Sequence, residues 1–290
     1  MSPDISLKRK VLRGATNIFG KCCDLLGPDF GPKFKAHLAA ELAPIECKNT
    51  KHGPLRFHCP GELPLMRAKT LLSKEPETIE WIDSFKKGAI FWDIGANVGV
   101  YSLYAALAGC SRILAFEPSA FNYHLLIKNI EINNLDSIIC GFCAAFDSNS
   151  STGSLELSST EVGAALHSFR STLKNPDAFK GVRQGMLAFS LDEFLTLFNP
   201  PFPNHLKIDV DGLELEILKG GEGFLADRRL QSILIEFDPI TPSESEPIHS
   251  VLEKAGFYLQ SKHKAPSPPG SIPRVEMNHI FTRQIPTKNK

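Results

Sequence analysis

One turn between a buried strand and a helix constrains the fold of this chain more than any other feature. The run 89–92 is apolar enough for a buried strand, and the run 100–107 has helical character. Between them lies the motif Asp93-Ile94-Gly95-Ala96-Asn97-Val98-Gly99. Gly95 permits a tight turn that a ligand can approach closely, and Gly99 permits close packing of the helix. This order predicts an α/β sheet with a ligand bound at the turn.

Strands and helices alternate from residue 88 onward. We expect further strands at 113–116, 138–142, 205–210, 232–237, 257–260 and 277–282, with helices at 122–132, 213–219 and 248–254. This alternation predicts a Rossmann-like α/β domain over residues 88–290. Its sheet should have seven mostly parallel strands, beginning at Ala89, with helices on both faces. The last two strands follow each other without an obvious helix, which favours one antiparallel strand.

Two segments stand outside this alternation. Residues 1–87 are expected to form an accessory cap, largely helical, with a short hairpin within 45–60. Residues 147–186 are rich in serine, threonine and glycine, and they are too many for an ordinary connection. Long excursions of this kind in compact domains often act as lids or binding loops, so we expect a lid over an acceptor here.

Charge and cysteine content exclude several classes of protein. Lysine plus arginine and aspartate plus glutamate both total 32, so no basic excess points to a nucleic-acid partner. The longest uncharged run, 94–111, contains three glycines and is no membrane span. The seven cysteines are scattered and odd in number, which argues against a disulfide framework and favours a reducing compartment. We therefore expect a cytoplasmic protein without a membrane partner, and the sequence does not predict its oligomeric state.

The chemistry of the glycine turn favours one cofactor. Its spacing is not the Gly-x-Gly-x-x-Gly of dinucleotide sites. A helix start attracts a carboxylate, whereas Asp93 suits an ammonium group, and S-adenosylmethionine carries both. Glu117 ends the next strand 24 residues after Asp93, close to the offset of about 20 residues at which an acid bonds ribose hydroxyls. The expected cofactor-binding residues are Asp93, Gly95, Asn97, Gly99, Glu117 and Asp147.

A second group of acids predicts the acceptor site. Lys207, Asp209 and Asp211 alternate along an expected strand, so their side chains should share one face. Ligands of open α/β sheets bind beyond the carboxyl ends of the strands. We expect Asp209 and Asp211 to be catalytic, with one of them, or His205, as general base for a hydroxyl. Mg²⁺ on the same acids is a less favoured alternative.

These motifs together resemble the FkbM family of methyltransferases. The resemblance covers about residues 75–240 and includes Glu75-Pro76-Glu77-Thr78, the glycine turn, Glu117-Pro118, Lys207-Ile208-Asp209-Val210-Asp211-Gly212-x-Glu214 and Ile235-Glu236. Asp211 departs from the family, which usually has glutamate there. The resemblance implies a class I methyltransferase fold and methyl transfer from S-adenosylmethionine, usually to a hydroxyl oxygen of a small molecule or glycan. A non-catalytic S-adenosylmethionine-binding module and a nicotinamide-dependent dehydrogenase are the alternatives.

Overall fold

The computed structural model describes residues 3–165, 167–170, 181–239, 242–264 and 277–283. The chain divides into two units, one with residues up to Ile45 and one that begins at Glu46. This division lies earlier than residue 88, where the strand–helix alternation begins. The reason is that the residues between these points pack onto the helices of the larger unit. Among the described residues, no helix is both long and apolar enough to cross a membrane.

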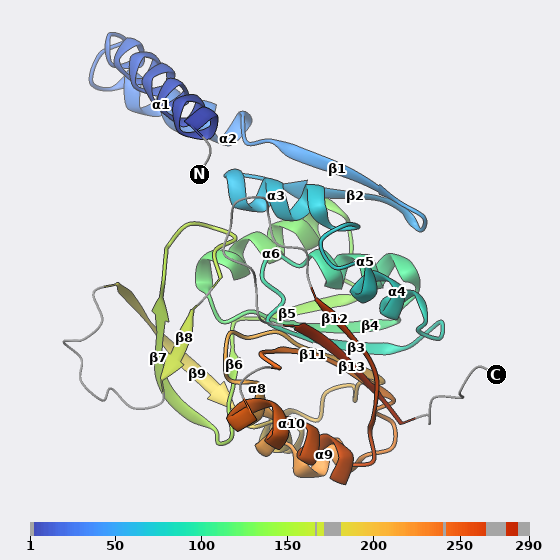
Figure 1. The fold of residues 1–290 in the computed structure, drawn as a ribbon. Coiled ribbons are helices and arrows are strands. Elements are labelled where there is room, and N and C mark those ends of the chain that lie inside the picture. Colours follow the sequence, from blue (N-terminus) through green and yellow to red (C-terminus); the bar gives the residue numbers. More distant parts are fainter. Residues whose placement is uncertain (1–2, 166, 171–180, 240–241, 265–276, 284–290) are drawn as a thin grey trace. The chain divides into compact units, whose positions relative to one another are not determined.

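A seven-stranded sheet forms the centre of the larger unit (Figure 1). The order of its strands is β12-β13-β11-β10-β3-β4-β5, and β13 runs antiparallel to both of its neighbours while the others are parallel. The strands are β3 (Ile90–Ile94), β4 (Arg112–Phe116), β5 (Ile139–Phe142), β10 (His205–Ile208), β11 (Ser232–Phe237), β12 (Tyr258–Lys264) and β13 (Met277–Thr282). The predicted seven-stranded, mostly parallel sheet is confirmed, with its first strand at Ile90.

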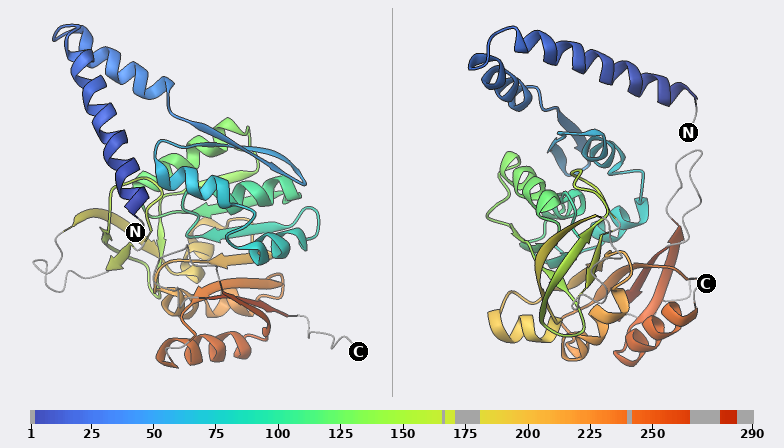
Figure 2. Two further views of the ribbon diagram at one scale, coloured as in Figure 1. Left: turned by 45° about the horizontal axis from the view of Figure 1, so that its top comes forward. Right: turned by 90° about the vertical axis from the view of Figure 1, so that its left-hand side faces the viewer.

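Helices cover both faces of this sheet, as the views of Figures 1 and 2 agree. One apolar cluster joins the strands to α3, α4, α5, α6 and the β1–β2 hairpin, and a second joins them to α7, α8, α9 and α10. These elements are β1 (Ile45–Thr50), β2 (Gly53–His58), α3 (Glu62–Thr70), α4 (Pro76–Asp83), α5 (Val100–Ala108), α6 (Ala120–Ile132), α7 (Leu191–Phe198), α8 (Glu214–Lys219), α9 (Glu222–Ala226) and α10 (Pro242–Lys254).

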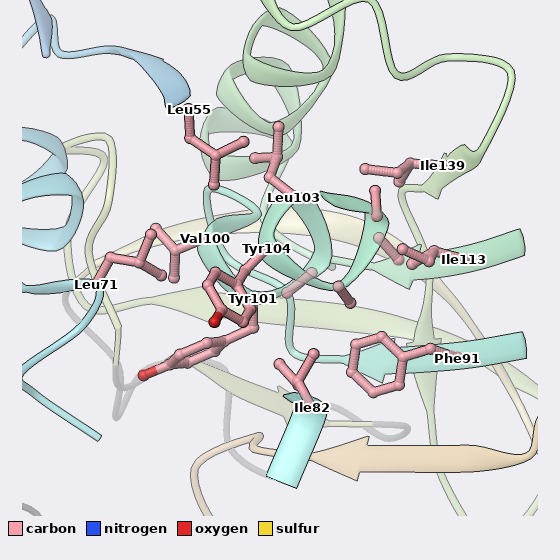
Figure 3. Packing of buried hydrophobic residues seen from close by; sticks show 14 of the residues in the cluster. Leu55, Leu71, Ile82, Phe91, Val100, Tyr101, Leu103, Tyr104, Ile113 and Ile139 are labelled. Atoms are coloured by element: carbon pink, nitrogen blue, oxygen red, sulfur yellow. The ribbon is translucent and has the colours of Figure 1, made fainter. Parts of the chain in front are cut away.

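The first cluster shows how the glycine turn is held in place. Leu103 and Tyr104 of α5 are buried against Phe91 of β3 and Leu55 of β2 (Figure 3). The α5 helix is apolar on nearly every side, which a helix between a sheet and a second layer requires. Burial of such side chains stabilises the fold by roughly 1.5–3 kcal/mol each. The start of α5, where a ligand would bind, is therefore rigidly supported.

The segment 147–186 is more ordered than a loop. Its described part contributes to a second sheet of order β6-β9-β7-β8, whose own core includes Leu155, Leu157, Phe169, Met186 and Ala188. The strands are β6 (Ala145–Phe146), β7 (Ser151–Leu157), β8 (Ser168–Arg170) and β9 (Val182–Phe189). The excursion therefore includes a mainly antiparallel sheet. Its expected role as an acceptor lid stays a prediction.

The smaller unit is a pair of helices, α1 (Pro3–Asp24) and α2 (Phe30–Glu41). They approach closely at Gly31, where an added Cβ would lie 2.6 Å from the carbonyl oxygen of Cys23. Gly27, with φ of +91°, turns the chain between the helices, and the Gly31 amide donates to its carbonyl. Most of the described side chains of α1 are exposed.

Candidate functional site

The glycine turn connects β3 to α5 and leaves one carboxylate oxygen unpaired. Asp93 is buried, and its Oδ2 accepts a hydrogen bond of 2.6 Å from the Ser102 hydroxyl. Its Oδ1 is buried without a hydrogen-bond partner in the described part of the chain. Burial raises the pKa of Asp93, against the pull of the Lys207 ammonium. A buried acceptor without a partner is costly, so this oxygen is suited to a donor on a ligand.

Gly95 places the turn directly against the second group of acids. Its φ is +86°, and a Cβ added there would lie 1.9 Å from the backbone oxygen of Asp209. The only residue that fits such a contact is glycine. The two sequence motifs, more than a hundred residues apart in the chain, therefore meet backbone to backbone. Gly99, also at φ of +86°, makes the same close approach to the side chain of Leu126 on α6.

Glu117 lies beside the turn and is held by backbone amides. Its Oε2 accepts a 2.8 Å bond from the Asn97 amide, and its Oε1 accepts a 2.9 Å bond from the Ser119 amide. Burial raises the pKa of Glu117 to about 7, although these hydrogen bonds oppose the shift. Each carboxylate oxygen can accept two bonds. Because Oε1 also accepts a 3.4 Å bond from Asn122 Nδ2, Glu117 is fixed in orientation and retains acceptor capacity for one further donor, at Oε2.

Asn97 and Asn122 tie the excursion to the glycine turn. The carbonyl of Ala164 accepts bonds of 3.0 Å from the side-chain amides of both residues. The Gly163 amide donates to Asn122 Oδ1 at 2.7 Å, and Arg67 Nε donates to the Gly163 carbonyl. Asn97 has a left-handed backbone, with φ of +50°, and its Oδ1 is a buried acceptor without a described partner. The segment between β7 and β8 therefore lies directly on the predicted cofactor turn.

Lys207 provides a buried positive charge among the acids. Its side chain is 1% exposed, and its Nζ lies 2.5 Å from Asp209 Oδ2. It pairs in register with Asp93 on β3, and its ammonium lies 5.2 Å from the centre of the Tyr101 ring. Burial opposes its charge, but Asp209, Asp93 and Glu75 together raise the pKa of Lys207. The lysine is therefore charged and balances several carboxylates.

Asp209 and Glu236 lie on neighbouring strand ends and share a proton. Burial opposes ionisation of Asp209, but Lys207 and a hydrogen bond with Glu236 hold the Asp209 pKa well below its ordinary value. The charge of Asp209 and burial raise the pKa of Glu236 to about 10. At neutral pH Asp209 is ionised and Glu236 is protonated. The side chain of Asp209 remains 25% exposed, so a ligand can reach it.

Glu75 joins this cluster from far upstream, and no role was predicted for it beyond its place in a motif. It directly precedes α4, is fully buried, and forms an ion pair with Lys74. Burial raises its pKa, but Lys74 and Lys207 outweigh this effect and lower it. Burial and a hydrogen bond with Glu75 raise the pKa of Tyr101, so this tyrosine keeps its proton. Glu75 and Tyr101 thus join Lys207, Asp209 and Glu236 in one cluster.

The predicted strand face that carries Lys207, Asp209 and Asp211 ends too early to include all three. β10 ends at Ile208, and Asp211 lies beyond it with a left-handed backbone, φ of +48°, and an exposed side chain. Glu214 causes this turn, because its Oε1 accepts bonds from the amides of Val210 and Gly212. The shared strand face is therefore wrong for Asp211, whose catalytic role stays a prediction. Glu214 thus acts on the start of its own helix, α8.

Comparison with known proteins identifies the family. The model of the methyltransferase FkbM domain matches residues 93–259, which include both groups of acids. The chain belongs to the FkbM methyltransferase family. The resemblance inferred from its motifs is therefore confirmed, and so is the expected Rossmann-like class I fold.

One curated relative and two solved structures are similar to this chain. The relative is the hexuronic acid methyltransferase AglP of Haloferax volcanii, 24% identical over 139 residues, or 48% of this chain and 52% of the relative. The chain thus spans about half the length of the relative. An FkbM methyltransferase from Methylobacillus flagellatus matches with a TM-score of 0.46 at 14% identity, over 77% of this chain and 55% of that one. Precorrin-6y C5,15-methyltransferase from Geobacter metallireducens matches with a TM-score of 0.42 at 14% identity, over 72% of this chain and 86% of that one.

The structure also places His205 and Asp147, two further residues predicted from the sequence. His205 is the first residue of β10, at the opposite end from Asp209, and its ring stacks on Phe85 at 3.7 Å. Burial lowers the pKa of His205 to about 3. The alternative of His205 as general base is therefore wrong, because the ring lies in the core. Asp147 follows β6, and its carbonyl oxygen would lie 2.5 Å from a Cβ added at Gly220.

The residues that would hold S-adenosylmethionine fit its chemistry. Asp93 Oδ1 and Asn97 Oδ1 are buried acceptors without described partners, and Gly95 leaves a turn that a Cβ would fill. Unpaired acceptors suit the ammonium and hydroxyl donors of this cofactor. Within the described ranges, no three or more histidine, cysteine or acidic side chains are grouped as metal ligands. The binding roles of the individual residues remain predictions.

Proposed function

We propose that this chain transfers the methyl group of S-adenosylmethionine to a hydroxyl oxygen of a sugar or a related small molecule. The observation that supports it best is the contact between Gly95 and the Asp209 backbone. A cofactor at the turn and an acceptor at Asp209 would then be neighbours. Methyl transfer depends mainly on such alignment. The relative that methylates a hexuronic acid favours a sugar as acceptor.

The residues have distinct roles in this proposal. Asp93, Gly95, Asn97, Gly99, Glu117 and Asp147 bind the cofactor, which supplies a methyl group activated by a sulfonium. Asp209, held ionised by Lys207, accepts a hydrogen bond from the acceptor hydroxyl and orients its oxygen. Because its pKa is low, Asp209 takes the proton only as the new oxygen–methyl bond forms and the sulfur–methyl bond breaks. The exposed Asp211 contacts the acceptor from the outer side.

The test is turnover of labelled S-adenosylmethionine on a panel of uronic acids, neutral sugars and other hydroxylated compounds. Asp209→Asn should keep cofactor affinity and lose about 10²–10⁴-fold in rate. Glu216→Gln is the matched control, because Glu216 pairs with Lys219 on the exposed side of α8. Normal turnover of Asp209→Asn on the true acceptor would contradict the proposal.

Three further measurements address the alternatives. A metal-independent site is indifferent to chelator, whereas loss of activity with chelator would favour Mg²⁺ on the same acids. Cofactor binding without methyl transfer to any compound would favour a non-catalytic binding module. Nicotinamide nucleotide binding in place of S-adenosylmethionine would favour a dehydrogenase, which the glycine spacing disfavours.

A further inference from the structure

The N-terminal helical unit exposes far more apolar surface than its size predicts. Seventeen large apolar side chains are exposed among the described residues, and nine of them lie within the first 45 residues of the chain. Four belong to α1 itself, and their side chains are 63%, 61%, 67% and 49% exposed at Val11, Leu12, Ile18 and Phe19. Contiguous exposed apolar surface on a soluble domain usually marks an interaction site. We therefore expect this surface to bind a partner.

The apolar residues of α1 form a stripe. Val11, Leu12, Ile18 and Phe19 recur one and seven residues apart, which places them on one face of a helix. Arg13 projects from the opposite face at 3.6 residues per turn, and Lys10 and Lys21 lie to its side. All three basic residues are exposed. Between Lys10 and Lys21 the helix thus has an apolar face and a basic face.

The basic charge of α1 is local. The helix sequence holds five basic and two acidic residues, whereas the whole chain has a formal net charge of zero. The rest of the chain is therefore slightly acidic, and the positive field is concentrated on the segment that carries the apolar stripe. A helix with apolar and basic faces of this kind binds in the plane of an anionic lipid surface.

We propose that α1 anchors this protein reversibly to anionic phospholipid surfaces. The apolar stripe would enter the boundary between headgroups and acyl chains, and the basic face would contact the phosphates. The helix lies on the bilayer, in agreement with the finding that no described helix can span one. A second copy of the chain is a poorer occupant, because it would bring two basic helices together. The proposal is independent of the methyl acceptor.

The test is co-sedimentation of the full-length protein with vesicles. Phosphatidylcholine vesicles with added phosphatidylglycerol should bind the protein, vesicles of phosphatidylcholine alone should not, and high salt should weaken binding. Val11→Ser combined with Ile18→Ser should reduce binding at least tenfold. Val182→Ser combined with Leu197→Ser is the matched control, because these side chains are 53% and 63% exposed in the larger unit. The control should bind as the unaltered protein does.

Three results would overturn the proposal. The first is absence of binding to the anionic vesicles, and the second is equal loss of binding in the stripe variant and in the control. The third is a dimer that becomes a monomer in the stripe variant without any vesicle binding, because a second copy would then cover the stripe. Neutralising Lys10, Arg13 and Lys21 to glutamine gives an independent measurement. It should abolish the preference for anionic over neutral vesicles.

Discussion

Replacing Lys207 with methionine tests whether one buried cation holds the acids of the site together. Lys207 Nζ lies 2.5 Å from Asp209 Oδ2, and its charge also acts on Asp93 and Glu75. The side chain is 1% exposed, so water cannot replace the lost charge. Breaking a buried pair by removing one partner costs about 3–5 kcal/mol. We expect a loss of that size in the free energy of unfolding at pH 7.

The loss should shrink as the pH falls. In the unaltered protein the Asp209 pKa is lowered, so its ionised form contributes stability above the ordinary pKa of an aspartate and loses it only in strong acid. Without Lys207 the buried carboxylates have raised pKa values, so the folded variant binds more protons than the unfolded chain. Its free energy of unfolding should therefore rise from pH 7 to pH 5, which narrows the difference between the two proteins.

Urea unfolding, followed by the fluorescence of the buried Trp81 and Trp92, measures both effects. Lys219→Met is the control, because its exposed pair with Glu216 should contribute less than about 1 kcal/mol at either pH. A deficit for Lys207→Met below about 1 kcal/mol would refute the role of this cation. A deficit that is the same at pH 7 and pH 5 would refute the account of its carboxylates.

Three other predictions concern the cofactor turn. The Glu117 pKa is about 7, so S-adenosylmethionine affinity measured by calorimetry should rise as the pH increases through 7. Glu117→Gln should remove this pH dependence and lower the affinity by about one to two decades. Gly95→Ala should destabilise the fold far more than Gly88→Ala in urea unfolding, since both have positive φ but only Gly95 lies against backbone; equal losses would contradict this. Asn122→Ala should free the Ala164 segment, so limited proteolysis should cleave that segment faster than in an Asn149→Ala control.

The sheet could be predicted because its signals are local. Apolar runs of strand length alternate with helical runs, and the glycine turn fixes which strand meets the ligand. The end of β10 had a local signal too, since Asp211-Gly212 is a turn dipeptide that argues against a strand continuing to Asp211. The second sheet also had a local signal in the sequence. Leu155 and Leu157 alternate, as do Met186 and Ala188, but the serine and glycine content favoured a loop.

The partners of the acids could be predicted only in part, because they depend on which strands and helices are neighbours in space. His205 begins β10 and Asp209 directly follows its last residue, so His205 lies at the amino end of the strand, away from the edge where ligands bind. Asp209 and Glu236 share a proton because Ile208 pairs with Ile235. Glu75 enters from a separate helix start. None of these proximities leaves a periodic trace in the sequence.

Lys207 changes the interpretation of the site as a whole. The sequence suggested two separate groups of acids, one group that binds the cofactor and one that contacts the acceptor. Lys207 pairs in register with Asp93 and bonds to Asp209, so both groups share one cation. A ligand ammonium near Asp93 would neutralise that carboxylate. More of the positive charge of Lys207 would then act on Asp209. With the proposed roles of these acids, cofactor binding and the protonation of Asp209 would be coupled through one buried lysine.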